Sequence, residues 1–508
     1  MPVLTIDSRQ VEVEPGTTLL KAAAKLGIDI PVFCYHDGLP VAANCRMCLV
    51  EVKGAAKPCP ACEIQARDGM EVLTASPLVL EARRSVLEFI LLNHPVDCPI
   101  CDQAGECILQ DHYFDHSASP SRTQVRKVHK AKAVPVGPNV TLDKERCINC
   151  TRCVRFCREI TGSRQLVQVQ RGNHTEISVF PGRQLDDPYS LCTVDLCPVG
   201  ALTSRDFRFQ KRAWFLKPAP AICPECSRGC NVWADAADGK LWRIRPRENP
   251  AVNQWWACDH GRLAFHRFEQ RRADRALVDY APRETSRAAT LEAAAVAAQR
   301  LQAIRSQGGR IILILSSMIS LEEGYAALRF ASVVLGQKLV LIASRPDGEK
   351  DALLRTQDAN CNRDGLSKLA ARMGLGAADL AGFFATAQAA EVAGLVSVGA
   401  EYAVPMLPEG ARMSEAVTLA HCLDPVADKS TVLLPIPGHF EKDGHYVNSA
   451  GLVQRSQPAL SPPDGCVQAH VLLSEIASKM GGSLGSSDLA SARTAALSLI
   501  GTGEGSHA

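Results

Sequence analysis

The sequence predicts a multidomain protein that combines α+β and α/β regions, and three observations support this fold class. The chain has 508 residues, of which 46% are apolar, so it can fill the cores of three or more domains. Of its 21 cysteines, 18 lie between Cys34 and Cys258. Beyond about residue 275, alanine-rich helical segments alternate with apolar strands, which is typical of an α/β layer domain.

The N-terminal region is predicted to begin with a strand and a helix. Residues 1–16 alternate like a strand, and no basic stretch with a following apolar core indicates a signal or transit peptide. A turn at the end of this strand leads into a helix over about 18–26, which stops at Gly27. A second helix over about 77–92 places His94 just past its end.

The rest of the chain is predicted to contain a linker, a layered domain and a tail. Segment 117–138 is polar and basic without periodicity, so we predict a surface linker rather than an anion-binding site. Apolar strands are predicted over 310–315 and 339–343. Residues 481–508 are rich in Gly, Ser and Ala, which predicts a short helix followed by a loose tail.

The first set of candidate ligands is Cys34, Cys45, Cys48 and Cys62, with Cys-x10-Cys-x2-Cys-x13-Cys spacing. Four thiolates suit a [2Fe-2S] cluster with two per iron, after a unit of ubiquitin-like appearance. Structural zinc also takes four thiolates, but its ligands generally come as two close pairs and this set has one. Cys59 competes with Cys62 for the fourth position, and the spacing from Cys48 favours Cys62.

The second set is His94, Cys98, Cys101 and Cys107, within the segment HPVDCPICDQAGEC. Four ligands on so short a segment can surround one [4Fe-4S] cubane, and a neutral imidazole in place of a charged thiolate is expected to raise its potential. Zinc remains an alternative on spacing alone.

The third set joins a Cys-x2-Cys-x2-Cys run to a distant Cys-Pro dipeptide: Cys147, Cys150, Cys153 and Cys197. This arrangement is that of a ferredoxin [4Fe-4S] site. Cys157 matches the position that would serve a second ferredoxin cluster, but only Cys192 is near enough to join it. We therefore predict that Cys157 and Cys192 are buried spare thiols.

The fourth set is Cys223, Cys226, Cys230 and Cys258, with Cys-x2-Cys-x3-Cys-x27-Cys spacing. It suits one further [4Fe-4S] cubane. Trp255 and Trp256 precede Cys258, where two roles are open, either shielding the site or packing in a core.

Composition excludes several classes of function. The net charge of +2 provides no field that would attract nucleic acid, and no apolar run approaches the roughly 20 residues of a membrane helix. Many cysteines without a secretion signal favour metal thiolates in a cytosolic protein over disulfides. No catalytic constellation and no glycine-rich dinucleotide fingerprint is visible, so a partner is expected to bind NADH or flavin. His112, His116, His260 and His266 are predicted to be isolated or near-surface residues with a structural role rather than metal ligands.

These motifs, in this order, closely resemble the large iron-sulfur subunit, of the G type, of respiratory complex I, the NADH:quinone oxidoreductase. The resemblance covers residues 1 to about 272 and rests on PVFCYHDGLPVAANCRMCLVEV, LLNHPVDCPICDQAGECILQD, CINCTRCVRFC and DLCPVGALTS. The fourth set resembles the cluster module of molybdopterin oxidoreductases.

The resemblance implies an electron-transfer subunit with one [2Fe-2S] and three [4Fe-4S] clusters and no catalytic residues of its own. Electrons would enter from a flavoprotein subunit that oxidises NADH, and a small [2Fe-2S] subunit and quinone-side subunits would be further partners. The second and third sets would form the path toward quinone, with the fourth set off that path. The chain would be cytoplasmic, reaching the inner membrane only through partner subunits and without direct membrane insertion.

Over about 290–480 the resemblance is weaker and rests on DALLRTQDANCNRDG and TVLLPIPGHFEKDGHYVNSAGLVQR. These segments look like pieces of a molybdopterin-enzyme domain, although the region is much shorter than in a full enzyme. Cys361 is the only candidate thiol for molybdenum there, and we expect neither molybdenum nor molybdopterin. A degenerate, structural α/β domain is favoured.

The predicted domains follow the ligand sets. They are a [2Fe-2S] ferredoxin-like domain (1–78), a helical histidine-ligated [4Fe-4S] domain (79–118), a ferredoxin-like [4Fe-4S] domain (119–215), a molybdopterin-oxidoreductase-type [4Fe-4S] domain (216–272), a degenerate molybdopterin-oxidoreductase-like α/β domain (273–480) and a tail (481–508).

Two alternatives to the complex I reading stay open. The chain also resembles the diaphorase-side subunits of soluble NAD-linked hydrogenases, formate dehydrogenases and electron-bifurcating enzymes. Those subunits use the same ligand sets but have other partners. A structural zinc-binding scaffold is an alternative from a different class.

Overall fold

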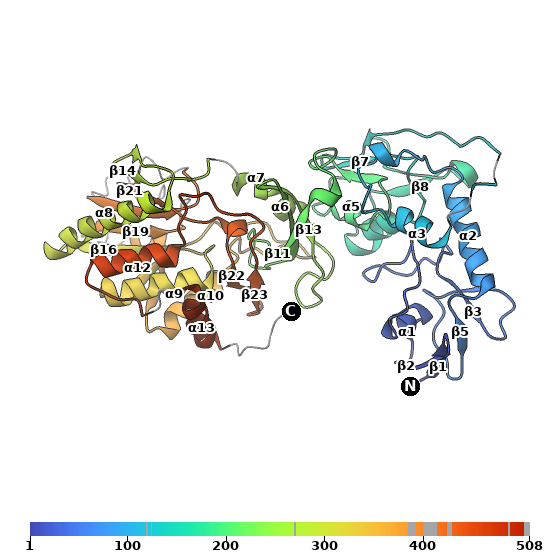
Figure 1. Cartoon of the computed structure of the whole chain (residues 1–508), viewed down its shortest axis with the longest axis horizontal. Helices are drawn as coiled ribbons and strands as arrows, with labels where there is room; N and C mark the ends of the chain where they lie inside the picture. Colours follow the sequence, from blue (N-terminus) through green and yellow to red (C-terminus); the bar gives the residue numbers. More distant parts are fainter. Residues whose placement is uncertain are drawn as a thin grey trace. The chain divides into compact units, whose positions relative to one another are not determined.

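The computed structural model describes residues 1–117, 120–122, 124–268, 271–384, 392–399, 414–423, 429–485 and 488–501. The chain divides into two compact units, Met1–Leu216 and Lys217–Ala508 (Figure 1). Within the described ranges, no helix combines the length and apolar character needed to cross a membrane.

The first unit begins with a mixed sheet of order β2-β1-β5-β3-β4 that packs against one helix. Its elements are β1 (Val3–Ile6), β2 (Arg9–Glu12), α1 (Leu19–Lys25), β3 (Leu49–Val52), β4 (Cys59–Pro60) and β5 (Glu71–Leu73). Thr18 caps α1 by accepting a hydrogen bond from the Lys21 amide, and Gly27 ends the turn with φ +70°. The predicted helix is thus confirmed.

The prediction of a single N-terminal strand is wrong, because the chain turns back at Asp7 and Ser8. Both residues have positive φ, 47° and 66°, and join β1 to β2 as an antiparallel pair. Two consecutive left-handed residues form the tight turn that suits the twist of a hairpin. Asp and Ser carry this turn without the glycine that would have signalled it.

The remainder of the first unit consists of short elements around the cysteine loops. These are α2 (Pro77–Leu91), α3 (Ile108–His116), β6 (Val134–Pro135), β7 (Val140–Leu142), α4 (Arg152–Arg155), β8 (Val167–Val169), β9 (Glu176–Ser178), α5 (Cys192–Leu196) and β10 (Leu202–Ser204). β10, β7 and β6 form one antiparallel sheet, and β8 pairs with β9. Ser76 caps α2, directly before a proline at the first helical position, so the second predicted helix is confirmed.

The described part of segment 117–138 does more than connect two domains. The Lys127 ammonium donates to the carbonyls of Leu91 (2.8 Å), Leu92 (3.2 Å) and His94 (2.8 Å). Lys127 therefore caps the C-terminus of α2, where a cation is favoured. The segment fixes the backbone that carries His94.

The second unit begins with an antiparallel three-stranded sheet, formed by β11 (Lys217–Ile222), β12 (Asn231–Ala237) and β13 (Lys240–Pro246). The loop between β11 and β12 holds three cysteines, and the Cys223 amide closes it by donating to the Cys230 carbonyl at 2.8 Å. α6 (Asp259–Leu263) starts directly after Cys258, and α7 (Phe265–Phe268) follows.

An eight-stranded sheet of order β15-β14-β21-β20-β19-β16-β17-β18 forms the body of the second unit. Its strands are β14 (Leu277–Val278), β15 (Ala281–Pro282), β16 (Arg310–Ser316), β17 (Leu339–Ala343), β18 (Gly376–Asp379), β19 (Val392–Val398), β20 (Glu415–Ala420) and β21 (Val432–Pro435). The pairs from β21 through β18 are parallel. This confirms the predicted α/β layer architecture and both predicted strands.

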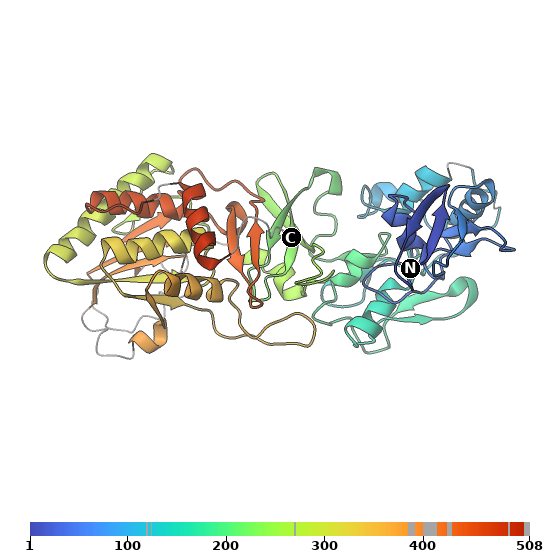
Figure 2. The ribbon, with the colours of Figure 1, turned by 90° about the horizontal axis from the view of Figure 1, so that it is seen from below.

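Helices cover both faces of this sheet (Figure 2). They are α8 (Arg287–Ser306), α9 (Leu321–Arg329), α10 (Arg363–Arg372), α11 (Leu380–Phe384), α12 (Ala469–Lys479) and α13 (Leu489–Ile500), and a separate hairpin pairs β22 (Gly444–Val447) with β23 (Val453–Ser456). Side chains of α8, α9, α10 and α12 share one core with Leu313 and Leu315 of β16, whereas Leu380 and Phe383 of α11 pack with Ile312 and Ile314. α13 is the predicted C-terminal helix, and the predicted tail over 502–508 lies outside the described residues.

Candidate metal centres

The first set converges around the sheet of the N-terminal region. Cys34, Cys48 and Cys62 are buried and Cys45 is half-buried. The Cys34 amide donates to Cys45 Sγ at 3.4 Å. Hydrogen bonds from the thiols of Cys45 and Cys62 lower the pKa of Cys34, and a hydrogen bond from Cys62 lowers that of Cys48. Hydrogen bonds thus link Cys34 to Cys45 and Cys62, and Cys62 to Cys48, in one group.

Cys59 and Cys62 differ in their surroundings although they are close in sequence. Cys62 is fully buried in the core of the sheet, and its thiol bonds with Cys34 and Cys48. The Cys59 thiol on β4 instead donates to the Lys57 carbonyl at 3.5 Å. The structure thus brings Cys62, and not Cys59, into hydrogen-bonding contact with Cys34 and Cys48.

The second set lines one cavity of about 710 Å³, between α2, α3 and the described part of segment 117–127. Cys101 and Cys107 are buried, while Cys98 and His94 are half-buried. The buried His94 Nδ1 atom has no hydrogen-bond partner. Burial lowers the pKa of His94 to about 4, so the imidazole is neutral near pH 7. A neutral ring with an unpaired buried nitrogen is suited to bind a metal.

An ion pair ties the second set to the third. Asp97, beside Cys98, accepts two hydrogen bonds from Arg146, beside Cys147, at 3.2 and 2.8 Å. Burial alone would raise the pKa of Asp97, but the hydrogen bonds from Arg146 and from Lys132 lower it to about 2. The carboxylate is therefore charged at any physiological pH.

The segment after Cys197 approaches the second set even more closely. A Cβ atom added at Gly200 would lie 2.4 Å from the Cys101 sulfur, well inside contact distance. Cys107 Sγ lies 3.9 Å from the Pro198 carbonyl oxygen. Glycine is the one residue that permits this approach of backbone to sulfur.

The third set lines a single cavity with apolar walls formed by residues such as Leu142, Ile177 and Val199. Its members are Cys147, Cys150, Cys153 and Cys197. Burial raises the pKa of Cys147 to about 12 and that of Cys150 to about 11. These thiols are therefore neutral by themselves and need a positive charge nearby to become thiolates.

Two buried arginines connect the first set to the third. Arg155 donates to the carbonyls of Cys34 and Pro40 in one loop and of Cys150 in the other. Arg152 donates to the carbonyls of Tyr35 and Leu196. A third contact joins the Asn44 amide to the Asn149 carbonyl at 3.3 Å.

Cys157 and Cys192 are buried and do not line the cavity of the third set. Burial raises the pKa of Cys157 to about 11. Cys157 lies on the irregular helical turn Phe156–Ile160 that follows α4, and Cys192 begins α5. Both positions agree with packing thiols.

The fourth set lines a cavity of about 120 Å³ in the second unit. Its members are Cys223, Cys226, Cys230 and Cys258. A Cβ atom at Gly261 would lie 2.7 Å from the Cys223 sulfur and 3.5 Å from that of Cys258. The Gly261 amide donates to Cys258 Sγ at 3.4 Å, so the Cys258 side chain caps the N-terminus of α6.

Neither tryptophan before Cys258 lines this cavity, whose remaining wall includes Arg355 and Thr356. Trp256 is buried and packs against Trp255 with ring centroids 6.2 Å apart, which favours the core-packing role.

Cys361 is also fully buried, which raises the pKa of its thiol to about 12, and it does not line the cavity of the fourth set.

Four family models match the chain in succession. They are "2Fe-2S iron-sulfur cluster binding domain" over 3–77, "NADH-ubiquinone oxidoreductase-G iron-sulfur binding region" over 83–122, "NADH-quinone oxidoreductase subunit 3, ferredoxin-like domain" over 137–203 and "Molybdopterin oxidoreductase Fe4S4 domain" over 216–270. The chain therefore contains a 2Fe-2S region and 4Fe-4S regions.

Curated relatives carry names from one family of respiratory enzymes. The G-type subunit of the NADH-quinone oxidoreductase of Streptomyces coelicolor is 39% identical over 352 residues, which cover 69% of this chain and 41% of the relative. The NADH-ubiquinone oxidoreductase 75 kDa subunit of Reclinomonas americana is 36% identical, over 70% of this chain and 52% of the relative. The mitochondrial NADH-ubiquinone oxidoreductase 78 kDa subunit of Neurospora crassa is 38% identical, over 68% of this chain and 46% of the relative. The chain therefore matches only about half of the length of these relatives.

Among solved structures, the crystal structure of NAD+-reducing [NiFe]-hydrogenase in the H2-reduced state is similar to part of the chain. The match has a TM-score of 0.38 and 29% sequence identity, and it covers 41% of this chain and 90% of that chain.

Proposed function

Because the chain is related to the G-type iron-sulfur subunits of NADH-quinone oxidoreductases, we propose that it relays single electrons from an NADH-oxidising flavoprotein subunit toward quinone. The observation that carries this proposal is the gathering of fifteen thiols and one imidazole into four separate groups. Iron-sulfur clusters, when bound, each accept and release one electron. Several centres in series are needed to carry electrons across a large protein, since tunnelling slows steeply with distance.

The side chains of the four sets are suited to bind iron-sulfur clusters. We assign the first set to a [2Fe-2S] cluster and the second, third and fourth sets to [4Fe-4S] clusters. Gly200 and Gly261 leave the sulfurs of Cys101 and Cys223 free of a Cβ contact, and His94 Nδ1 is unpaired. The third cavity is small, about 20 Å³, so the thiols there have to rotate apart when a cluster binds.

The contacts between the loops support an order for the relay within the first unit. Arg155 joins the loop of Cys34 to that of Cys150, which connects the first set to the third. The Arg146–Asp97 pair and the approach of Gly200 to Cys101 connect the third set to the second. We therefore assign the sequence first, third, second, with the fourth set, in the other unit, off this path.

The second unit supports a structural role for the C-terminal region. We propose that residues 273–480 form a degenerate molybdopterin-oxidoreductase-like domain that binds no molybdopterin, since the weaker resemblance there rests on fragments of that fold. The proposed location is cytoplasmic, with attachment to a membrane complex through partner subunits.

The partners can be identified by anaerobic native purification of the chain from its own cells, followed by mass spectrometry of the co-purifying proteins. We expect an NADH-binding flavoprotein subunit, a small [2Fe-2S] subunit and quinone-side subunits with membrane-embedded proteins. Recovery of a hydrogenase or formate dehydrogenase catalytic subunit instead would contradict the quinone assignment and leave the ligand sets unchanged.

The choice between Cys62 and Cys59 gives a direct prediction for the first set. Cys62→Ala is expected to remove the electron paramagnetic resonance signal of the reduced [2Fe-2S] cluster, because the Cys62 thiol bonds with Cys34 and Cys48. Cys59→Ala serves as the matched control and is expected to retain the signal, since its thiol bonds to a carbonyl. The opposite pattern would exchange the two roles.

Replacing the histidine ligand is expected to change the potential of the second cluster without removing it. In His94→Cys, a charged thiolate would replace a neutral imidazole, which stabilises the oxidised state and lowers the potential. A redox titration monitored by electron paramagnetic resonance measures this shift. An unchanged or higher potential would show that His94 is not a ligand.

A further inference from the structure

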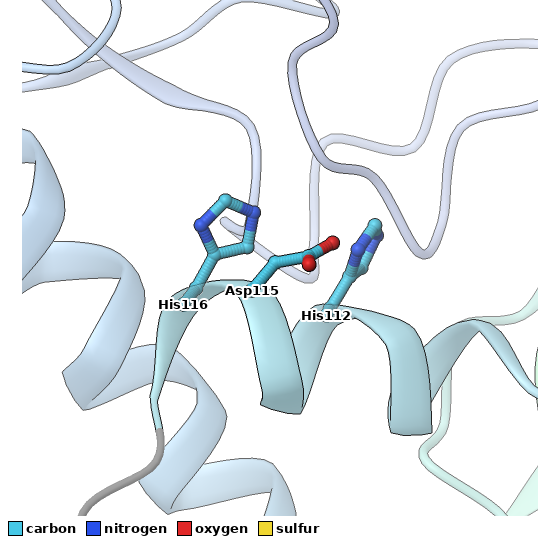
Figure 3. Close-up of side chains that lie close together, drawn as sticks. All are labelled: His112, Asp115 and His116. Carbon is cyan, nitrogen blue, oxygen red and sulfur yellow. The ribbon is translucent and has the colours of Figure 1, made fainter.

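A group of three metal-binding side chains lies at the C-terminal end of α3, apart from the four sets. His112, Asp115 and His116 stand at positions i, i+3 and i+4 of the helix, so they share one face. One ligand atom from each lies within 4.8 Å of the other two. Figure 3 shows both imidazoles projecting from the same side of the helix, with the Asp115 carboxylate between them.

The orientation of one ring is set by a hydrogen bond that suits a metal ligand. A ring nitrogen of His112, Nε2, lies 3.2 Å from the Val32 carbonyl oxygen. Donation of Nε2–H to this carbonyl leaves Nδ1 as the nitrogen with a lone pair. Histidines that bind metals usually donate their other N–H in this way, which fixes the tautomer and raises the basicity of the ligand.

The same ring contacts the loop that leads to Cys34. Phe33 packs edge-on against His112 with ring centroids 5.0 Å apart. The rings of His112 and His116 are 5.9 Å apart and tilted by 52°, so they are not stacked on each other. One ligand atom of each ring still lies within 4.8 Å of that of the other.

The charges around the two imidazoles favour a dication. Asp29, Asp115 and Asp111 all act electrostatically on His112, and Asp115 and Asp29 act on His116. The opposing cation is Arg83, which acts on His116 and donates to the Leu49 carbonyl. The end of α3 adds the negative pole of a helix. Carboxylates therefore outnumber cations among the charged groups that act most strongly on the two rings.

We propose that His112, His116 and Asp115 bind a divalent transition-metal ion, with Zn²⁺ as the preferred ion. Two imidazole nitrogens and one carboxylate oxygen, with water in the fourth position, form a tetrahedral zinc site. Half-buried imidazoles and an exposed carboxylate can close from 4.8 Å to tetrahedral spacing by side-chain rotation. All three ligands lie on α3, and the His112 ring would connect the ion to the loop before Cys34 through its contacts with Val32 and Phe33.

Zinc binding is measured on the complete, anaerobically purified chain with its clusters intact. Equilibrium dialysis against ZnCl2, with zinc and iron counted by mass spectrometry, is expected to show one saturable zinc per chain and no loss of iron. Constant iron content shows that zinc has not replaced iron in a cluster site. Zinc-edge X-ray absorption is expected to show nitrogen and oxygen neighbours and no sulfur.

Variants test whether zinc binds at the group of His112, Asp115 and His116 or at another histidine. His116→Ala and Asp115→Asn, which removes an exposed carboxylate, are each expected to weaken zinc binding by at least about tenfold. His174→Ala, at an exposed histidine outside the group, is the matched control and is expected to bind as the unmodified chain does. Absence of saturable zinc binding, sulfur neighbours to the zinc, or equal affinity in all variants would overturn the proposal.

Discussion

Gly200→Ala is expected to remove the cluster of the second set while leaving the other three in place. The added Cβ would lie 2.4 Å from the Cys101 sulfur and 3.0 Å from the Gln103 Cβ, so the sulfur has to leave its position. The displaced sulfur would no longer hold the position from which Cys101 lines the cavity with His94, Cys98 and Cys107. The chain is expected to lose about four of roughly 14 irons, together with electron transfer to any acceptor beyond the second set.

Iron analysis and electron paramagnetic resonance of the reduced protein measure this loss. Gly382→Ala is the matched control, because nothing lies within 4 Å of a Cβ there. The control is expected to keep its full iron content. A Gly200→Ala protein with all of its iron and an unchanged signal for the second cluster would contradict the close approach of this backbone to Cys101.

Arg155→Met is expected to destabilise the first unit and to disconnect the first set from the third. The Arg155 guanidinium is buried and donates to three backbone carbonyls in two loops. Removing a charged donor leaves these carbonyls unsatisfied, at a cost of about 3 kcal/mol or more. The unfolding midpoint of the holoprotein is expected to fall by about 5–10 °C. Electron transfer between the first and third clusters is expected to slow.

Arg158→Met is the control for this prediction. Arg158 lies one turn beyond Arg155, is exposed, and pairs with the exposed Glu159. A surface pair of this kind contributes at most about 1 kcal/mol, so the midpoint is expected to stay within about 3 °C of that of the unmodified chain. Calorimetry of both variants gives the comparison. Equal midpoints for Arg155→Met and Arg158→Met would show that the guanidinium does not hold the two loops together.

Residue type and spacing predicted which side chains the structure brings together, because short Cys-x2-Cys runs constrain their ligands locally. Among the downstream members, Cys197 is recognisable from the Cys-Pro signal, and Cys62 and Cys258 from their spacing after the upstream cysteines. The assignment of each group to a particular cluster, the number of clusters and the positions of the domain boundaries stay predictions.

The residues that connect the sets were not predictable from local patterns. Arg155 contacts a carbonyl 121 positions away in sequence, and Gly200 meets a sulfur about a hundred residues earlier. An arginine within a run of cysteines and a glycine after a Cys-Pro dipeptide can each be present for many structural reasons. Only the tertiary packing distinguishes them, since long-range contacts leave no periodic signal.

The histidines of α3 illustrate a different failure. Without a predicted helix over residues 108–116, the sequence gives no reason to place His112 beside His116. Once the segment is helical, positions 112 and 116 fall on one face, and their ring centroids are 5.9 Å apart. The helix is short and weakly amphipathic, so its hydrophobic pattern does not reveal it.

Mössbauer spectroscopy of the anaerobically purified, iron-57-enriched chain, with iron, sulfide and zinc counted on the same sample, tests the central claim most directly. The proposed ligand sets predict about 14 irons per chain, about two in a [2Fe-2S] cluster and about 12 in [4Fe-4S] clusters. A colourless protein with well under about ten irons, and zinc in their place, would instead establish a zinc-binding scaffold and contradict the electron relay.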